Sequence, residues 1–265
     1  MGLMSSTDAS SPGTLILLGG EGLRPPASTS LWERIGALAP GDQPVVIVPV
    51  ALAARRRSAV ERRVRLAQRT LEGFGLSTRV VMIFNAAQAN DPALIAPLEE
   101  ATCLYLPGGE ARTLCEVMRG SAAWRVICAR VRVGVPLVAG AGAAVALGEW
   151  AFAPRKPYPQ ALDALEFDVF PGLGLLPGVI VLPHANRLQP QVEQKITAAC
   201  PPDVAPVTID EEAALLVRGD QWEIIGDGLV SIRGGGPGRS LSVRCEERTS
   251  EEGLSPPAPP NSETG

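Results

Sequence analysis

The chain alternates short apolar runs with longer segments in which apolar positions recur every three to four residues. The runs are nearly continuous and end in Gly or Pro, a pattern typical of strands buried on both faces of a sheet. The first part of the chain predicts strands over 14–20, 44–51, 79–84, 102–109 and 135–140, and helices over 30–39, 58–74, 91–101 and 110–131, the last as one or two helices. This alternation predicts a mainly parallel sheet covered by helices on both faces and joined by right-handed crossovers.

The pattern changes after Trp150. Residues 170–187, FPGLGLLPGVIVLPHANR, are rich in Gly and Pro and end in a predicted strand, and residues 190–200 predict a helix. Residues 205–235 hold several short apolar runs separated by Arg-Gly-Asp and Gly-Asp-Gly turns. Such spacing predicts an antiparallel meander at the C-terminal end of the fold.

The ends of the chain differ from its middle. Residues 1–12 are rich in Ser, and residues 247–265 are rich in Pro, Ser and Glu. Segments of this composition bury too little apolar surface to order, so we expect two disordered tails. Because no internal repeat and no interdomain linker interrupts the rest, we expect one α/β domain with a mixed sheet over residues 13–246.

Composition narrows the function classes. The chain has 265 residues and a formal net charge of −4, which does not favour a nucleic-acid surface. The Arg-rich residues 54–69 mix Arg with apolar residues at helical spacing, which favours a solvated helix face over an anion or partner site.

No apolar run reaches the roughly 18 residues of a membrane span. Five Cys without a C-x-x-C pair predict mostly buried, reduced thiols and a cytoplasmic location.

Three predicted strand ends are rich in small residues. They are Gly19-Gly20-Glu21, Gly108-Gly109-Glu110 and 139–144. Ligands of open α/β sheets bind at the carboxyl ends of the strands, so these turns mark the candidate site. A dinucleotide fingerprint is not favoured, because Pro25 and Val145 stand where its third glycine is needed, and no phosphate-binding P-loop is present. We therefore expect no cofactor.

The turn at 139–144 raises a chemical question. It lies in VPLVAGAGAAVALGEW, residues 135–150, which predicts a strand, a tight turn and a helix. In hydrolytic α/β enzymes such a turn presents a nucleophile, but here it contains Gly and Ala alone. The single histidine, His184, follows a later strand, and Glu211 stands near the start of another. This chain order is one in which a nucleophile–His–acid triad can be arranged.

Each of these polar residues also has a structural interpretation. A lone histidine is more often structural, Glu211 alone is a turn carboxylate, and Arg187 alone is a surface cation. No second His and no paired Cys stands at ligand spacing, so we expect no metal site.

Four segments, taken together, resemble peptidase family S51, which includes cyanophycinases and dipeptidase E. FPGLGLLPGVIVLPHANR resembles the segment with the family's catalytic histidine, and TIDEEAALLV resembles the segment with its acid. LYLPGGEARTL resembles the Gly-Gly strand end whose amides help form the oxyanion hole, and AGAGAAVALG resembles the Thr-Ser-Ala-Gly-Ala-Ala nucleophile elbow. The resemblance runs from about Leu15 to Arg233.

The resemblance implies a fold and an activity. The fold is a flavodoxin-like, class I glutamine-amidotransferase-like three-layer α/β fold. The activity is serine-type hydrolysis of acidic peptides, either β-Asp-Arg units or Asp-X dipeptides. The family also implies a homodimer.

Site residues follow from the resemblance position by position. His184 matches the base, Glu211 the acid, and Gly109 and the amide of Ala141 the oxyanion donors. The nucleophile position falls on Gly140, and a shift by one residue gives Ala139 or Ala141, which also lack a hydroxyl.

The expected ligand contacts are Gly108, Glu110 and Arg187. Two departures accompany the missing serine: Leu182-Pro183 replace the family's Asp-Gln before the histidine, and Glu110-Ala111 follow the Gly-Gly pair.

Glycine has no atom that can attack a carbonyl. It tolerates the strained backbone of an elbow, so we expect that Gly140 relieves strain and that the protein hydrolyses poorly. We predict a non-catalytic binding or regulatory homologue with a small acidic peptide or carboxylate as ligand. One alternative is an active hydrolase that uses water, or a serine such as Ser58 or Ser121, with His184 and Glu211. Another is a structural or interaction subunit.

Overall fold

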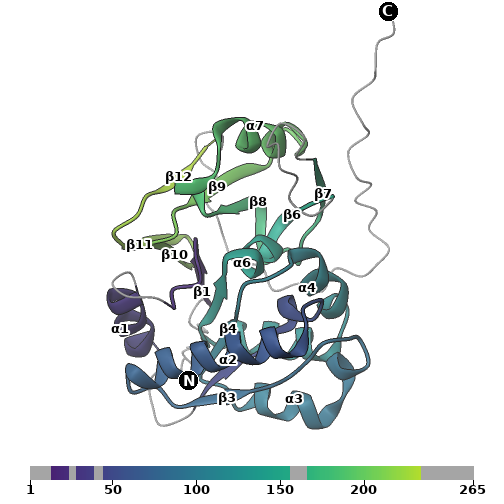
Figure 1. Cartoon of the computed structure of the whole chain (residues 1–265), viewed down its shortest axis with the longest axis vertical. Helices are drawn as coiled ribbons and strands as arrows, with labels where there is room; N and C mark the ends of the chain where they lie inside the picture. The colour runs from purple at the N-terminus through teal and green to yellow at the C-terminus, as the bar shows by residue number, and fades with distance from the viewer. Residues whose placement is uncertain (1–12, 24–27, 39–43, 156–165, 234–265) are drawn as a thin grey trace, which may run out of the picture.

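The computed structural model describes residues 13–23, 28–38, 44–155 and 166–233 (Figure 1). The predicted tails, and residues 234–246 of the predicted domain, lie outside these ranges. The first half of the chain forms β1 (Thr14–Leu18), α1 (Ser28–Leu38), β2 (Val45–Ile47), η1 (Val50–Leu52), α2 (Arg57–Gly73), β3 (Thr78–Val80), η2 (Gln88–Asn90), α3 (Pro92–Glu99), β4 (Cys103–Leu106), α4 (Ala111–Met118) and α5 (Ala122–Arg132). The second half forms β5 (Leu137–Gly140), α6 (Ala141–Leu147), β6 (Gly148–Pro154), β7 (Phe167–Pro171), β8 (Leu176–Pro183), η4 (Ala185–Arg187), α7 (Pro190–Ala198), β9 (Ala205–Ile209), β10 (Ala213–Arg218), β11 (Gln221–Gly226) and β12 (Val230–Ile232).

The main sheet has the strand order β11-β10-β1-β5-β4-β2-β3. The five strands β1, β5, β4, β2 and β3 are parallel to one another. The two remaining strands are antiparallel additions at one edge: β10 pairs with β1, and β11 pairs with β10. This arrangement confirms the predicted flavodoxin-like α/β fold with a mainly parallel sheet.

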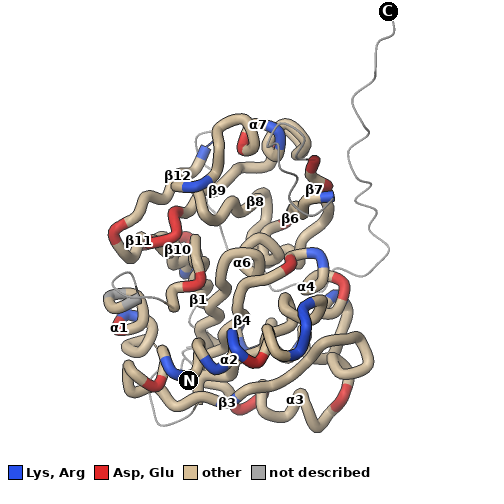
Figure 2. The backbone as a smooth tube through the Cα atoms, in the orientation of Figure 1, with Lys and Arg blue, Asp and Glu red and all other residues tan. Residues whose placement is uncertain are grey.

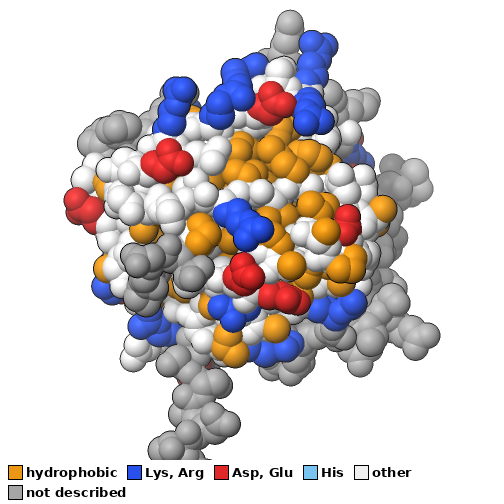
Figure 3. Space-filling view, turned by 90° about the horizontal axis from the view of Figure 1, so that it is seen from below, with side chains coloured by type: hydrophobic (Ala, Val, Ile, Leu, Met, Phe, Trp, Pro, Cys, Tyr) orange, Lys and Arg blue, Asp and Glu red, His pale blue; other side chains and the backbone are white. Residues whose placement is uncertain are grey.

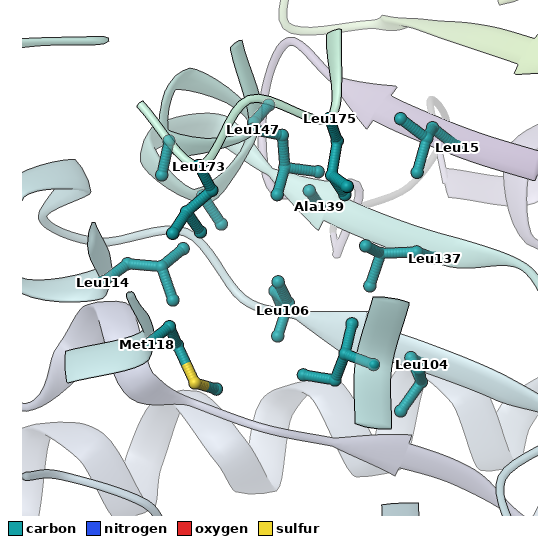
Figure 4. Packing of buried hydrophobic residues seen from close by; sticks show 14 of the residues in the cluster. Leu15, Leu104, Leu106, Leu114, Met118, Leu137, Ala139, Leu147, Leu173 and Leu175 are labelled. Atoms are coloured by element: carbon teal, nitrogen blue, oxygen red, sulfur yellow. The ribbon is translucent and has the colours of Figure 1, made fainter. Parts of the chain in front are cut away.

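Alternate strand residues enter cores on opposite faces of the main sheet, as a period of two requires. Leu15 and Leu17 belong to one core cluster, and Ile16 and Leu18 belong to the other. The first cluster also takes residues from α3, α4, α5 and α6, and the second takes residues from α1 and α2. The sheet is therefore the middle of three layers. Figure 4 shows the first cluster, in which Leu114 and Met118 of α4 approach Leu106.

A second sheet, with the order β12-β9-β8-β6-β7, lies beside α7 at the top of Figure 1. Strand β8 joins this sheet to the rest of the protein: Val179 and Val181 belong to the first core cluster, and Ile180 and Leu182 pack with residues of α7. Burial of both faces explains why β8 reads as a continuous apolar run.

The C-terminal strands are antiparallel in part, but they do not form one meander. β10 and β11 extend the main sheet as a hairpin, whereas β9 and β12 belong to the second sheet, and β9 is parallel to β8. The period-two pattern of a strand is the same in either sheet, so the sequence alone did not divide them.

The five strands predicted in the first part of the chain are all shorter in the structure, and two of them show why. The run 44–51 ends its pairing at Ile47 and continues as η1, whose preceding residue, Pro49, has no N–H to donate to a ladder. The run 79–84 pairs only through β3, the outermost strand, although Val81 and Ile83 remain buried. Apolar runs therefore marked burial correctly and overestimated strand length.

Three of the four cysteines within the described ranges are buried. Burial raises the pKa of the Cys103 thiol to about 12 and that of the Cys115 thiol to about 12. Both are therefore protonated and unreactive at neutral pH.

The surface carries charges of both signs. Arg is frequent along α2, and most of these side chains are exposed, as the prediction of a solvated helix face requires (Figure 2). On the face seen from below, hydrophobic side chains are interspersed with both signs of charge (Figure 3). Among the described helices, none combines the length and the apolar character needed to cross a membrane.

Candidate functional site

Three neighbouring strands end at the candidate site. β1, β5 and β4 lie side by side in the main sheet, and the three glycine-rich turns follow their carboxyl ends. The amide of Ala141 donates to the carbonyl of Gly20 at 3.1 Å, which links the β5 turn to the β1 turn. A Cβ on Gly108 would lie 2.8 Å from the carbonyl oxygen of Gly140, so glycine is required where the β4 turn meets the β5 turn. The turns predicted to share one edge of the sheet therefore lie in contact.

His184 and Glu211 come together although 27 residues separate them in sequence. His184 Nδ1 lies 2.7 Å from Glu211 Oε1, a hydrogen bond of charge-assisted length. The imidazole is 43% exposed and the carboxylate 22% exposed, so the pair lies at the surface of the site. The bond leaves Nε2, on the far side of the ring, as the nitrogen that faces away from the acid. This is the geometry of a base oriented by an acid.

Main-chain contacts hold this pair at the junction of the two sheets. His184 follows β8 of the second sheet, and its amide donates to Gly19 of the β1 turn at 2.9 Å. Glu211 lies between β9 and β10, where the chain passes from the second sheet to the main sheet. Its amide donates to Asn186 Oδ1 at 3.1 Å. Asn186 is a positioning residue that sequence reasoning missed, since nothing in its local pattern indicates a bond to residue 211.

His184 has a left-handed backbone, with φ 56° and ψ 36°. A left-handed conformation costs an L residue roughly 1–2 kcal/mol. Such strain clusters at functional sites, where it is retained because it aims a side chain. The strain here allows the chain to turn sharply from β8 into η4 with the imidazole directed toward Glu211.

Arg187 was predicted to contact a ligand, and in the structure it forms an ion pair with Glu211. Its guanidinium lies 2.8 Å from Glu211 Oε2, so both oxygens of the Glu211 carboxylate have a partner. The Arg187 side chain is 74% exposed, and an ion pair this accessible contributes at most about 1 kcal/mol. A ligand contact by Arg187 stays a prediction and would compete with this ion pair.

The elbow differs from the expectation in its backbone. Gly140 has φ −88° and ψ 138°, ordinary extended values that any residue adopts. The left-handed residue is Ala141, with φ 36°. The expectation that Gly140 relieves elbow strain is therefore wrong: the strain falls one residue later, on an alanine. Neither residue carries a hydroxyl, so the absence of a serine at the turn does not depend on which position matches the family's nucleophile.

The residues predicted to form the oxyanion hole and to contact a ligand have other partners in the structure. The amide of Ala141 already donates to Gly20, so an oxyanion could receive it only if that bond broke. Gly109 packs against η1, where a Cβ would overlap the carbonyl oxygen of Ala51. Glu110 forms an ion pair with Arg55 at 3.6 Å, and both side chains are substantially exposed. The roles of Gly109, Ala141 and Glu110 in binding or chemistry stay predictions.

Sequence reasoning placed Glu21 in a candidate turn but gave its carboxylate, which lies beside the elbow, no role. Glu21 Oε2 accepts a hydrogen bond from the amide of Gly108 at 3.3 Å, and Glu21 Oε1 lies 3.4 Å from Arg63 Nη1 of α2. The amide of Gly108, a predicted ligand contact, therefore already donates to an acceptor within the protein. The available signal was the position of Glu21, directly after the Gly19-Gly20 pair at a strand end.

The two alternative serines have other surroundings. Ser121 is buried, and its Oγ accepts from the amide of Trp124 at 3.1 Å as the cap of α5. Ser58 lies in the first turn of α2. Neither is at a strand end, so the geometry favours neither as a replacement nucleophile.

These features define a class of protein: a flavodoxin-like α/β protein with a strand–helix elbow at the carboxyl edge of its sheet and an oriented His–Glu pair. The family model described as peptidase family S51 matches residues 15–225, and the chain belongs to this family.

Curated relatives carry the name cyanophycinase. The chain is 32% identical over 148 residues to cyanophycinases of Trichormus variabilis and of a Nostoc species, a match that covers 55% of this chain and 49% of each relative. It is 28% identical over 157 residues to a cyanophycinase of Geminocystis herdmanii, covering 58% of this chain and 57% of the relative. The matches thus span about half the length of these relatives.

Solved structures share the fold at low identity. A peptidase from an acI-B1 Actinobacterium superposes with a TM-score of 0.72 at 22% identity, covering 88% of this chain and 96% of its own. A putative peptidase E protein from Listeria monocytogenes gives a TM-score of 0.56 at 16% identity, covering 81% of this chain and 98% of its own. At these identities the likeness establishes the fold alone.

Proposed function

We propose that this S51 protein is a catalytically impaired homologue that binds a small acidic peptide or carboxylate in a binding or regulatory role. The observation that carries the proposal is the contrast within one site: a 2.7 Å His184–Glu211 bond beside an elbow of glycine and alanine. Acyl transfer needs an attacking atom as well as a base and an acid. In a well-studied protease, loss of the serine alone reduces kcat by roughly 10⁶.

The ligand class rests on the relatives. Proteins named cyanophycinase match half of this chain, and the family resemblance implies β-Asp-Arg or Asp-X substrates. The imidazole of His184 and the guanidinium of Arg187 are donors suited to a carboxylate, and the amides of Gly108 and Ala141 become donors once a ligand displaces their internal acceptors. A cytoplasmic location and a homodimer are further parts of this proposal.

Turnover and binding assays test the proposal directly. The purified protein is expected to show no measurable hydrolysis of β-aspartyl-arginine, cyanophycin or Asp-X dipeptides, while an acidic dipeptide raises its melting temperature. The His184→Ala variant is expected to lose that shift. A kcat of about 1 s⁻¹, within the ordinary range for enzymes, that disappears in His184→Ala would overturn the impaired function.

The second candidate is an active hydrolase in which His184 activates a water. The oriented His184–Glu211 pair favours it, because a base held by an acid is the machinery that such a reaction needs. A fluorophosphonate probe separates a serine enzyme from the other possibilities, since it labels an activated serine. Turnover without labelling would favour the water mechanism. Absence of both turnover and ligand binding would favour a structural or interaction subunit.

A further inference from the structure

The carboxylate of Glu21 lies inside the group of glycine turns. Glu21 follows the β1 turn, yet its side chain reaches the β4 turn, where Oε2 accepts from the amide of Gly108 at 3.3 Å. Its other oxygen, Oε1, lies 3.4 Å from the guanidinium of Arg63, and the Glu21 side chain is 20% exposed. A charged side chain with this little exposure and two partners has a defined position rather than a solvated one.

The same carboxylate lies beside the position of the missing nucleophile. A Cβ built on Gly140 would lie 3.5 Å from Glu21 Oε2 and 3.2 Å from the amide nitrogen of Gly108. The first atom of any side chain at Gly140 would therefore touch both members of the Glu21–Gly108 hydrogen bond. A ligand group that approaches the Gly108 amide from the elbow meets the carboxylate as well.

The backbone around Glu21 is anchored by aromatic side chains. The hydroxyl of buried Tyr105 donates to the carbonyl of Glu21 at 3.2 Å, and the indole N–H of Trp32 donates to the carbonyl of Gly22. The two rings meet edge to face with centroids 5.4 Å apart. Burial, and after it the negative charge of Glu21, raises the pKa of Tyr105. These contacts hold the backbone from which the Glu21 side chain extends toward Gly108.

A ligand carboxylate or a developing oxyanion needs the same kind of donor that Glu21 already occupies. It would have to displace the Glu21 carboxylate from Gly108, and it would meet a like charge while doing so. Arg63 balances only part of that charge, because its guanidinium contacts one oxygen and is itself 39% exposed.

We propose that Glu21 is a specificity-determining residue of the elbow: its carboxylate is an internal ligand of the Gly108 amide and competes there with the acidic group of the ligand, which weakens binding of that group without preventing it. This inference rests on the proposed function, since it places the ligand at the elbow. The carboxylate restricts the site to ligands that displace it, and its removal opens the Gly108 amide to an acidic group.

Calorimetric titration of the full chain with the dipeptide Asp-Ala, and with Asn-Ala, which lacks only the side-chain carboxylate, tests this. Glu21→Gln removes the charge and keeps the shape, and Glu21→Ala also frees the amide. The dissociation constant for Asp-Ala is expected to fall about fivefold or more in both variants, because a like charge has been removed from the site. Asn-Ala is expected to change less than twofold in Glu21→Gln. The matched control is Glu61→Gln. Glu61 lies on α2, the helix that carries Arg63, and its carboxylate pairs with Arg57, so this variant is expected to bind like the parent.

The outcomes separate this inference from the proposed function. If the parent binds Asp-Ala and the Glu21 variants bind it equally or more weakly, the inference is wrong and the proposed function stands. If neither the parent nor either variant binds Asp-Ala at millimolar concentration, both fail. Should Glu21→Ala not fold, Glu21→Gln decides the question, because its amide oxygen can still accept from Gly108.

Discussion

The two halves of the candidate site are built in different ways. The His184–Glu211 half consists of side chains that satisfy one another, with Arg187 on the second carboxylate oxygen. The elbow half consists of backbone and methyl groups, with the carboxylate of Glu21 on the Gly108 amide. One half holds an oriented His–Glu pair, and the other holds no hydroxyl between Val138 and Val145.

The difference shows that the His–Glu geometry does not depend on a nucleophile. The amide of His184 donates to Gly19, and the amide of Glu211 donates to Asn186, so both residues also join the two sheets. None of these bonds involves a side chain of the elbow. The main-chain bonds of His184 and Glu211 therefore give the pair a structural role of its own, and its presence alone does not establish catalysis.

The largest effect is expected from a methyl group at Gly142. A Cβ there would overlap the carbonyl oxygen of Gly109, a backbone atom that cannot move alone, so Gly142→Ala should lower the free energy of unfolding by about 3 kcal/mol. The matched variant is Gly140→Ala, whose Cβ would come no closer than 3.2 Å to a neighbour and should cost less than about 1 kcal/mol. Urea unfolding followed by circular dichroism measures both. Equal losses would contradict the packing described for the elbow.

The next effect concerns the acid. Glu211→Gln removes the charge that holds both His184 and Arg187, and we expect a loss of about 1–2 kcal/mol because both partners are partly exposed. The neighbouring Glu212→Gln is the control, since Glu212 is exposed and should change stability by less than about 0.5 kcal/mol. The same unfolding experiment applies, together with the dipeptide-induced shift in melting temperature. A shift that survives in Glu211→Gln would separate ligand binding from the His–Glu pair.

The strain at Ala141 can be measured against a second alanine of α6. Ala141→Gly and Ala143→Gly each remove one buried methyl, but only Ala141 has a positive φ. Because glycine adopts that conformation freely, Ala141→Gly should be more stable than Ala143→Gly by about 1–2 kcal/mol. Equal stabilities would mean that the left-handed residue lies elsewhere in the turn.

The smallest effect is expected at His184. His184→Ala and His184→Gly both lose the bond to Glu211. Alanine still has a Cβ, which is strained at φ 56°, whereas glycine has none. His184→Gly should therefore be the more stable variant by about 0.5–1 kcal/mol. Thermal unfolding of the pair, compared at one pH, measures the difference. The reverse order would argue against a left-handed His184.

Much of the fold and part of the site could be predicted. The continuous apolar runs identified buried strands, and the glycine turns of β1, β4 and β5 were correctly assigned to one edge of the sheet. The chain order of small residue, His184 and Glu211 indicated which distant residues to compare. The position of Glu21 after Gly19-Gly20 indicated that it lies near the site, but its hydrogen bond to the Gly108 amide could not be predicted, because it joins residues 87 positions apart.

The sequence by itself determined local periodicity, the residue types at each turn, and the absence of a hydroxyl between Val138 and Val145. Tertiary structure alone decided three other properties: which sheet each late strand joins, which elbow residue is left-handed, and which carboxylate occupies the Gly108 amide. The physical reason is that periodicity records burial, which each segment expresses separately. Strand partners, backbone strain and hydrogen-bond acceptors depend on residues far apart in sequence, and these are fixed only when the layers pack together.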